Sequence, residues 1–203
     1  IRAPRKILIG KSTTRGMGAG ALPENGEAAA RENDNDIRQF LTGSNIVFVT
    51  AGMGGGTGTG SAHYVASIAK EQIRALTIGV VTFPFKAEGT VRAENAMIGL
   101  NKLRSVCDTT IVVPNDKLLE VAARGTSMLA ALRFADDVLR QGVQGICDLV
   151  TVPGLINLDL ADVRTIMTGA GTAHMGIGRG RGDQRAQRAA EMAVNSSLLM
   201  CAV

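Results

Sequence analysis

The stretch NIVFVTAGMGGGTGTGS, residues 45–61, decides the fold, because an apolar run ends directly in a glycine-rich segment. Residues 45–50 have the β-branched and aromatic side chains that are typical of a buried strand. A glycine loop between a strand and a helix lets backbone N–H groups approach phosphate oxygens, and the positive end of the helix dipole favours an anion. Residues 54–60 therefore predict a phosphate-binding loop. A tightly packed glycine turn without a ligand is the alternative.

Strands and helices alternate on both sides of this loop. We expect strands at residues 6–9, 45–50, 76–83 and 110–114, a strand-like segment at 173–178, and helices at 24–41, 60–73, 89–104, 127–149 and 183–195. Alternation at these lengths is typical of a parallel sheet with helices on both faces. The predicted fold class is α/β and Rossmann-like, with a long central helix followed by the start of a second, α+β domain.

The composition is that of an ordinary water-soluble protein. The longest apolar runs in the 203 residues are far shorter than the roughly 20 residues of a membrane-spanning helix, so we expect no direct insertion into a membrane. The chain begins IRAPRKILIG, without Met or a signal sequence, so export is not predicted and a longer parent chain is expected. Cys107, Cys147 and Cys201 are far apart, which predicts neither a disulfide framework nor a zinc site and favours a reducing cytoplasm.

Positive charge raises the question of nucleic-acid binding. The net charge is +4, and arginines are concentrated at residues 178–188. Aromatic residues make up only 3% of the chain and Trp is absent, so platforms for stacking bases are scarce. A glycine turn leading into a solvated helix explains the arginines, and we expect no nucleic-acid partner.

Two common nucleotide-binding loops do not match residues 54–60. A P-loop needs Lys followed by Ser or Thr after its second glycine, and a dinucleotide fingerprint normally opens the first strand of its fold. A dinucleotide-dependent oxidoreductase would also need a ribose-binding acid about 20 residues after the loop, and residues 76–81, LTIGVV, contain none. The loop therefore indicates a different kind of phosphate site.

Residues GGGTGTG at 54–60 resemble the signature loop of the tubulin/FtsZ GTPases, and the surrounding sequence resembles the bacterial cell-division members of that family. RGMGAG at 15–20, with Pro23 and Gly26, is similar to the family's γ-phosphate loop. PNDKLL at 114–119 is similar to a loop near the sugar, and GLINLDLADV at 154–163 to the catalytic synergy loop. The resemblance covers nearly all 203 residues.

The resemblance also implies a division of the chain. Residues 1–124 correspond to part of a GTP-binding domain, 125–150 to a long connecting helix, and 151–203 to the synergy loop and the beginning of the C-terminal domain. The family begins with a further strand and a GGxG-type phosphate loop, and it continues into a full C-terminal domain. We therefore expect this sequence to be a fragment that lacks the first loop and most of the last domain.

By the same resemblance the bound nucleotide is GTP or GDP, and Mg²⁺ between the phosphates is expected, without an identifiable protein ligand. Asp136 takes the position of the acid that accepts hydrogen bonds from the guanine edge. Leu132 stands where the family usually has an aromatic residue, with Phe134 two residues later. A surface ion pair is the alternative for the pattern EGTVR at residues 88–92. The nucleotide-contacting residues implied are Gly18, Ala19, Gly20, Gly54, Gly55, Gly56, Thr57, Gly58, Thr59, Glu88, Arg92 and Asp136.

Hydrolysis of a phosphoanhydride depends on positioning water and neutralising charge, so a histidine base is not required. We expect His63 and His174 to be structural, and His63 stands where the family commonly has proline. The resemblance implies that Asp159 and Asp162 orient or polarise the attacking water and that Asn157 helps to position it. Capping of the following helix is an alternative role for the two aspartates, and it is compatible with catalysis.

The long helix separates these acids from the glycine loop of their own chain. At about 1.5 Å per residue, it is about 35 Å long and runs from the carboxyl edge of the sheet to the opposite edge. Asp159 and Asp162 therefore cannot act on a nucleotide bound to the same subunit. If they are catalytic, they complete the pocket of the next subunit, and such a head-to-tail contact generates open filaments.

The resemblance thus implies a GTPase that polymerises head-to-tail into the bacterial division ring and hydrolyses GTP within the polymer. The implied partners are further copies of the protein, accessory proteins of the division ring and membrane-tethering proteins. The implied location is the cytoplasm at the midcell division site. The second hypothesis is an inactive or regulatory GTP-binding element with a role in assembly only.

Overall fold

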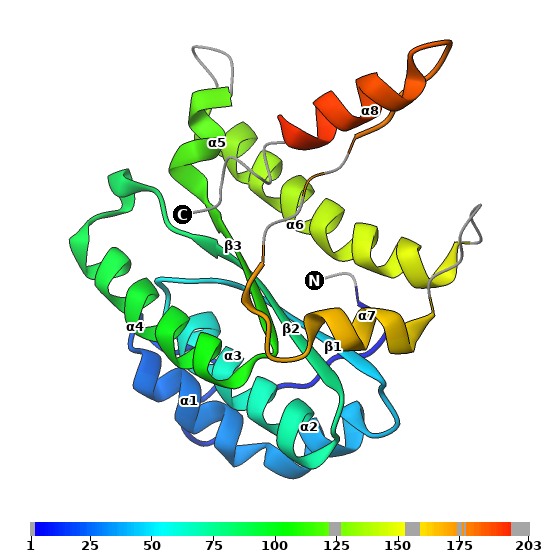
Figure 1. Ribbon diagram of the computed structural model, residues 1–203. Helices are drawn as coiled ribbons and strands as arrows, with labels where there is room; N and C mark the ends of the chain where they lie inside the picture. The colour runs from blue at the N-terminus through cyan, green and yellow to red at the C-terminus, as the bar shows by residue number, and fades with distance from the viewer. Residues whose placement is uncertain (1–2, 122–126, 153–158, 174–175, 177, 196–203) are drawn as a thin grey trace.

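A parallel sheet forms the centre of the protein, as the computed structural model shows for residues 3–121, 127–152, 159–173, 176 and 178–195 (Figure 1). The strands follow one another in chain order across the sheet, and all neighbours are parallel. They are β1 (Ile46–Gly52), β2 (Leu76–Phe83), β3 (Thr109–Pro114) and β4 (Gly171–Thr172). Ile46 pairs with Leu76, and Ile78 with Thr109, so the carboxyl ends of β1, β2 and β3 share one edge.

Helices connect these strands and continue the chain beyond them. They are α1 (Pro23–Glu32), α2 (Asp34–Leu41), α3 (Thr57–Ser67), a π-helix (Ile68–Gln72), a 3-10 helix (Lys86–Glu88), α4 (Thr90–Val106), α5 (Asn115–Val121), α6 (Met128–Thr151), α7 (Leu160–Met167) and α8 (Arg185–Val194). Within the described ranges, no helix combines the length and the apolar character needed to cross a membrane.

Both faces of the sheet are covered. Because side chains alternate along a strand, Val81 packs on one face and Val80 on the other. The first face packs against α1 to α4, and the second against α6 and α7, where Ile146 and Val163 are buried (Figure 1). This confirms the predicted α/β class, the parallel sheet and the long helix, which is α6.

The helix predicted over residues 24–41 is in fact two helices, α1 and α2, that meet at Asn33. The Asn33 side chain accepts a hydrogen bond from Gly10 N at 3.0 Å and donates one to Asp36 Oδ2 at 2.9 Å. Asn favours such local bonds over continued helix, and here one of them ties the helix junction to a residue far away in sequence.

Two further expectations differ from the structure. Residues 6–9 were expected to form a strand, but they pair with no strand in the described part of the chain; Ile7 and Ile9 instead pack against the core beneath α1 to α4. Residues 114–119, likened to a loop near the sugar, lie at the end of β3 and in the short helix α5, whose Leu118 is buried beside Val113. In both places apolar side chains pack into the core, but the short apolar pattern in the sequence does not show whether the backbone forms a strand, a helix or a loop.

Glycines allow α1 and α3 to touch backbone to backbone. A Cβ atom on Gly60 would overlap the carbonyl oxygen of Pro23 and lie 2.7 Å from Glu27 N, and a Cβ on Gly26 would overlap the carbonyl of Gly56. Side chains larger than hydrogen therefore cannot be accommodated at this crossing. The contact holds the segment before α1 against the loop before α3.

We predict that Gly60→Ala lowers the free energy of unfolding by about 3 kcal/mol, because its new methyl group must displace backbone atoms in a packed interior. Gly142→Ala on α6 is the matched control, since its Cβ would meet Val80 Cγ1 at 3.6 Å, an ordinary contact. It should be neutral or stabilising by up to about 1 kcal/mol, because Ala favours helix over Gly. Urea unfolding of both variants checks this, and equal stability would contradict the proposed close crossing.

Candidate functional site

Three loops meet at the carboxyl edge of the sheet. The first is the segment 18–20 before α1, the second is the glycine loop 54–59, and the third is the turn 88–92 before and at the start of α4. A Cβ on Gly56 would lie 2.7 Å from Ala19 Cβ, and a Cβ on Gly54 would lie 2.8 Å from the carbonyl oxygen of Arg92. The structure therefore brings together three segments that the sequence analysis assigned to one site.

Several glycines of these loops face open space. Gly18 and Gly20 have φ angles of 81° and 59°, which favour glycine, and a Cβ on either would have no atom within 4 Å. The same holds for the space beside Gly55. Within the described part of the chain, the backbone N–H groups of residues 55–59 have no hydrogen-bond acceptor. Bare backbone, free N–H groups and the start of α3 fit an anionic group such as a phosphate.

Thr59 has a structural contact within the glycine loop. Its side chain is buried, and its hydroxyl oxygen accepts a hydrogen bond from Gly54 N at 2.9 Å. Its methyl group packs so close to Gly99 on α4 that a Cβ there would overlap it. The hydroxyl therefore shapes the loop from inside, and a direct contact of Thr59 with nucleotide stays a prediction.

The loop that carries Gly18 and Gly20 is held from the far end of α1. Glu32 accepts hydrogen bonds from Ser12 N at 2.8 Å and from Thr13 N at 3.0 Å. These bonds lower the pKa of Glu32 to about 2, and the bond from Ser12 N has the largest effect. Asn95 on α4 adds a bond from Nδ2 to the carbonyl oxygen of Ala21 at 3.2 Å. The loop is thus anchored to both α1 and α4.

Glu88 and Arg92 form the ion pair that the sequence analysis gave as the alternative to nucleotide contact. Glu88 also accepts a hydrogen bond from Phe85 N at 2.9 Å, which closes the turn. Asp136 lies exposed on α6. Phe134 packs with the small core of Val113 and its neighbours, whereas Leu132 is exposed. The nucleotide-contacting roles of Glu88, Arg92 and Asp136 remain predictions.

Asp159 and Asp162 are exposed and cap α7. Asp162 N donates to Asp159 Oδ1 at 2.9 Å, and Asp159 N donates to Asp162 Oδ2 at 3.2 Å, so the predicted capping role is confirmed. Asn157 and His174 lie outside the described residues.

Arg164, which the sequence analysis missed, fixes where these acids lie. Its guanidinium donates to the carbonyl oxygens of Asn45, at 3.1 Å, and Arg74, at 3.4 Å, which precede β1 and β2. Met167 O also accepts a hydrogen bond from Thr109 Oγ1 at 2.6 Å, at the start of β3. Helix α7 is therefore attached to the amino edge of the sheet, opposite the three loops (Figure 1).

Comparisons with known proteins identify relatives of this chain. Residues 1–123 match the family described as "Tubulin/FtsZ family, GTPase domain". Cell division protein FtsZ 1 of Archaeoglobus fulgidus is 54% identical over 198 residues, which are 98% of this chain and 53% of that protein. An empty FtsZ dimer from M. jannaschii superposes with a TM-score of 0.90 at 48% identity, over 98% of this chain and 57% of that one.

A more distant solved structure shares the fold. CetZ from Methanosaeta thermophila superposes with a TM-score of 0.76 at 23% identity, over 92% of this chain and 53% of that one. The chain spans about half the length of the relatives that it matches.

We predict that Thr59→Val destabilises the protein by about 1–3 kcal/mol, because the buried Gly54 N–H loses its acceptor while the side-chain shape is kept. Thr59→Ser retains the hydroxyl and should cost only about 1 kcal/mol for the lost methyl group. Chemical denaturation of the two variants gives the comparison. A Ser variant less stable than the Val variant would show that packing against Gly99, and not the hydrogen bond, shapes the loop.

Proposed function

The chain belongs to the tubulin/FtsZ family of GTPases, and from this we propose that it is part of a cytoskeletal cell-division protein that binds GTP and polymerises head-to-tail. Hydrolysis in this proposal takes place between subunits. The relatives named above come from archaea, so membership of the bacterial branch stays a prediction.

The three loops at the carboxyl edge support GTP binding there. Free N–H groups of residues 55–59 and the open space beside Gly18, Gly20 and Gly55 would receive the phosphates. Asp136 would accept from the N1–H and 2-amino groups of guanine. Adenine has no 2-amino group and no proton on N1, so the same carboxylate would discriminate against it. Arg92, already in contact with the glycine loop through its backbone, would reach the sugar or phosphates together with Glu88.

A magnesium ion bound with the nucleotide would have to be coordinated mainly by phosphate oxygens and water. Among the described residues, no group of three or more His, Cys, Asp or Glu side chains could hold a metal ion. This fits the way Mg²⁺ usually binds nucleotides, with few protein ligands. The ion would neutralise charge that develops on the phosphates during hydrolysis.

The placement of two sets of groups on opposite edges of one sheet carries the proposal. Strand β1, with seven residues, spans roughly 20 Å between the edges at about 3.3 Å per residue. Asp159 and Asp162 cap α7, and Arg164 attaches this helix to the amino edge, opposite the glycine loop of the same chain. In a head-to-tail contact they would meet the γ-phosphate of the next subunit and orient the attacking water, with Asn157 assisting.

We extend the proposal to organisation and partners. Residues 1–124 and the helix 125–150 would form the nucleotide-binding part, and 151–203 would begin the next domain. The partners would be further copies of the protein, with division-ring accessory and membrane-tethering proteins, in the cytoplasm at midcell. The competing hypothesis is a GTP-binding element that assembles without hydrolysing, and turnover measurements separate the two.

In the full-length protein, Asp162→Asn should lower GTP turnover by about 10²–10⁴-fold, the usual contribution of a positioned catalytic carboxylate. GTP affinity should change little, because the nucleotide of each subunit lies at the other edge. Asn retains a side-chain oxygen that can accept from Asp159 N, so the helix cap is kept. Steady-state turnover and equilibrium binding are measured on the same samples. An equal loss of binding and turnover would contradict catalysis in trans.

A complementation experiment supplies the control. Gly55→Glu places a negative charge where open space faces the glycine loop and should abolish nucleotide binding without a clash. In a random mixture of equal parts with Asp162→Asn, roughly a quarter of head-to-tail contacts pair an intact pocket with intact acids. Recovery of turnover on mixing supports hydrolysis between subunits. No recovery, in mixtures shown to co-assemble, would favour the non-hydrolysing alternative.

A further inference from the structure

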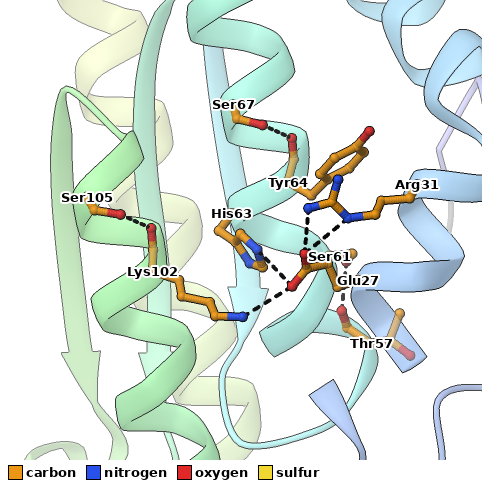
Figure 2. Close-up of polar contacts among 9 residues, drawn as sticks. All are labelled: Glu27, Arg31, Thr57, Ser61, His63, Tyr64, Ser67, Lys102 and Ser105. Carbon is orange, nitrogen blue, oxygen red and sulfur yellow. Dashed lines mark hydrogen bonds and ion pairs between the residues drawn. The ribbon is translucent and has the colours of Figure 1, made fainter. Parts of the chain in front are cut away.

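One carboxylate, Glu27, joins three helices behind the loops of the candidate site. Its Oε1 atom accepts a hydrogen bond at 2.7 Å from the guanidinium of Arg31, which lies on the same helix, α1. Its Oε2 atom lies 3.2 Å from His63 Nε2 on α3 and 3.2 Å from Lys102 Nζ on α4. Figure 2 shows the three side chains converging on Glu27. We call these four residues the Glu27 cluster. The sequence analysis gave no role to Glu27 or Lys102 and expected His63 to be structural.

Each of these helices begins at a segment of the candidate site. Helix α1 follows the loop 18–20, α3 begins within the glycine loop at Thr57, and α4 holds Arg92 in its first turn. The contacts of Glu27 therefore connect all three segments through their helices. A change of charge inside the cluster would act on the segments together.

His63 is the member of the cluster whose charge can change near neutral pH. Its side chain is only 13% exposed, and its Nδ1 atom is buried without a hydrogen-bond partner among the described residues. With Nε2 facing Glu27, the arrangement fits a neutral ring that carries its proton on Nε2. A second proton would place a buried N–H group on Nδ1 where no described acceptor is available.

The charges that face His63 come from two helices. Glu27 and Arg31 lie on α1, and Lys102 lies on α4. Burial lowers the pKa of His63 most, the two cations lower it further, and Glu27 raises it. Glu27 itself has a lowered pKa, chiefly through its hydrogen bond from Arg31, so it stays ionised between pH 5 and pH 7. The charge of Glu27 therefore stays constant when His63 takes up a proton.

The direction of the pH effect follows. Because the pKa of His63 is lower in the folded protein than in the unfolded chain, the unfolded chain takes up a proton more readily. The stabilising contribution of neutral His63 is therefore complete well above its ordinary pKa of about 6.5 and decreases as the pH falls below it. The junction of α1, α3 and α4 becomes less stable in mild acid.

We propose that the Glu27 cluster is a pH-sensitive positioning element for the nucleotide site, in which protonation of His63 loosens the junction of the three helices and weakens nucleotide binding. This rests on the proposed function, since it assumes that the three loops bind a nucleotide. Glu27, His63 and Lys102 are positioning residues in this inference, because they act through the helices and not through contact with the ligand.

The test compares full-length wild-type protein with His63→Gln, whose amide can still donate to Glu27 but does not titrate. The dissociation constant of GDP is measured for both at pH 7.5 and pH 5.5. Wild-type affinity should fall several-fold more than that of the variant, because His63 takes up a proton more readily in the nucleotide-free protein than in the complex. Protonation of the nucleotide phosphates affects both proteins equally, so the difference reports His63. Equal losses would overturn the proposal.

A second variant tests the direction. Lys102→Met removes a cation that lowers the pKa of His63, so the loss of GDP affinity should begin at a higher pH than in the wild type. A purely structural salt bridge would change the melting temperature without moving this midpoint. An unchanged midpoint would therefore contradict the positioning role.

Amide hydrogen exchange of the nucleotide-free proteins separates failure of this inference from failure of the proposed function. At pH 5.5, the hydrogen-bonded amides of Gly54 and Gly60 should exchange several-fold faster in the wild type than in His63→Gln, while at pH 7.5 the two proteins should exchange alike. If GDP binds neither protein at pH 7.5, the proposed function fails, yet this difference still supports the pH-sensitive junction. Equal exchange at both pH values would overturn it.

Discussion

Everything at the carboxyl edge of the sheet depends on how closely the backbones of α1 and α3 approach each other. At Gly26 and Gly60 the two helices leave no room for even one methyl group, and Gly56 fits against Ala19 in the same way. Close packing of this kind is rigid, because moving one backbone displaces the other. The segment before α1 and the loop before α3 therefore behave as one surface. The free N–H groups and open space of the site are features of that shared surface, not of a single loop.

The parallel sheet then determines which chemistry one subunit can contain. All strands point the same way, so loops after the strands gather at one edge and residues before them gather at the other. The glycine loop belongs to the first group. Helix α7 is attached to the second by the guanidinium of Arg164, by the hydroxyl of Thr109 and by the burial of Val163 against the sheet. In the proposed mechanism one subunit binds the nucleotide and the next supplies the acids, and this arrangement follows from the common strand direction and from the contacts that hold α7 at the amino edge.

The sequence predicted well those features that depend on local pattern. The strands β1 to β3 and the glycine loop were recognisable from local sequence, because buried strands require runs of apolar residues and a bare backbone requires glycine. Features set by contacts between distant residues were not. The helix break at Asn33 depends partly on Gly10, the packing of Ile7 and Ile9 does not require a strand, and Arg164 binds carbonyl oxygens 90 and 119 residues away. Backbone carbonyls carry no residue-specific signal, so the role of Arg164 could not be inferred from neighbouring residues.

The sharing of Glu27 among several cations has a consequence for how this sequence can vary. Replacing Glu27 with a neutral residue leaves Arg31 and Lys102 close together without the anion between them, and replacing it with a basic residue adds a further positive charge. Losing a cation at the same time would reduce the repulsion that either change creates. Free energies of substitution at these positions are therefore expected to be strongly non-additive. In evolutionary terms, we expect the residues that join the three helices through Glu27 to vary as an epistatic group.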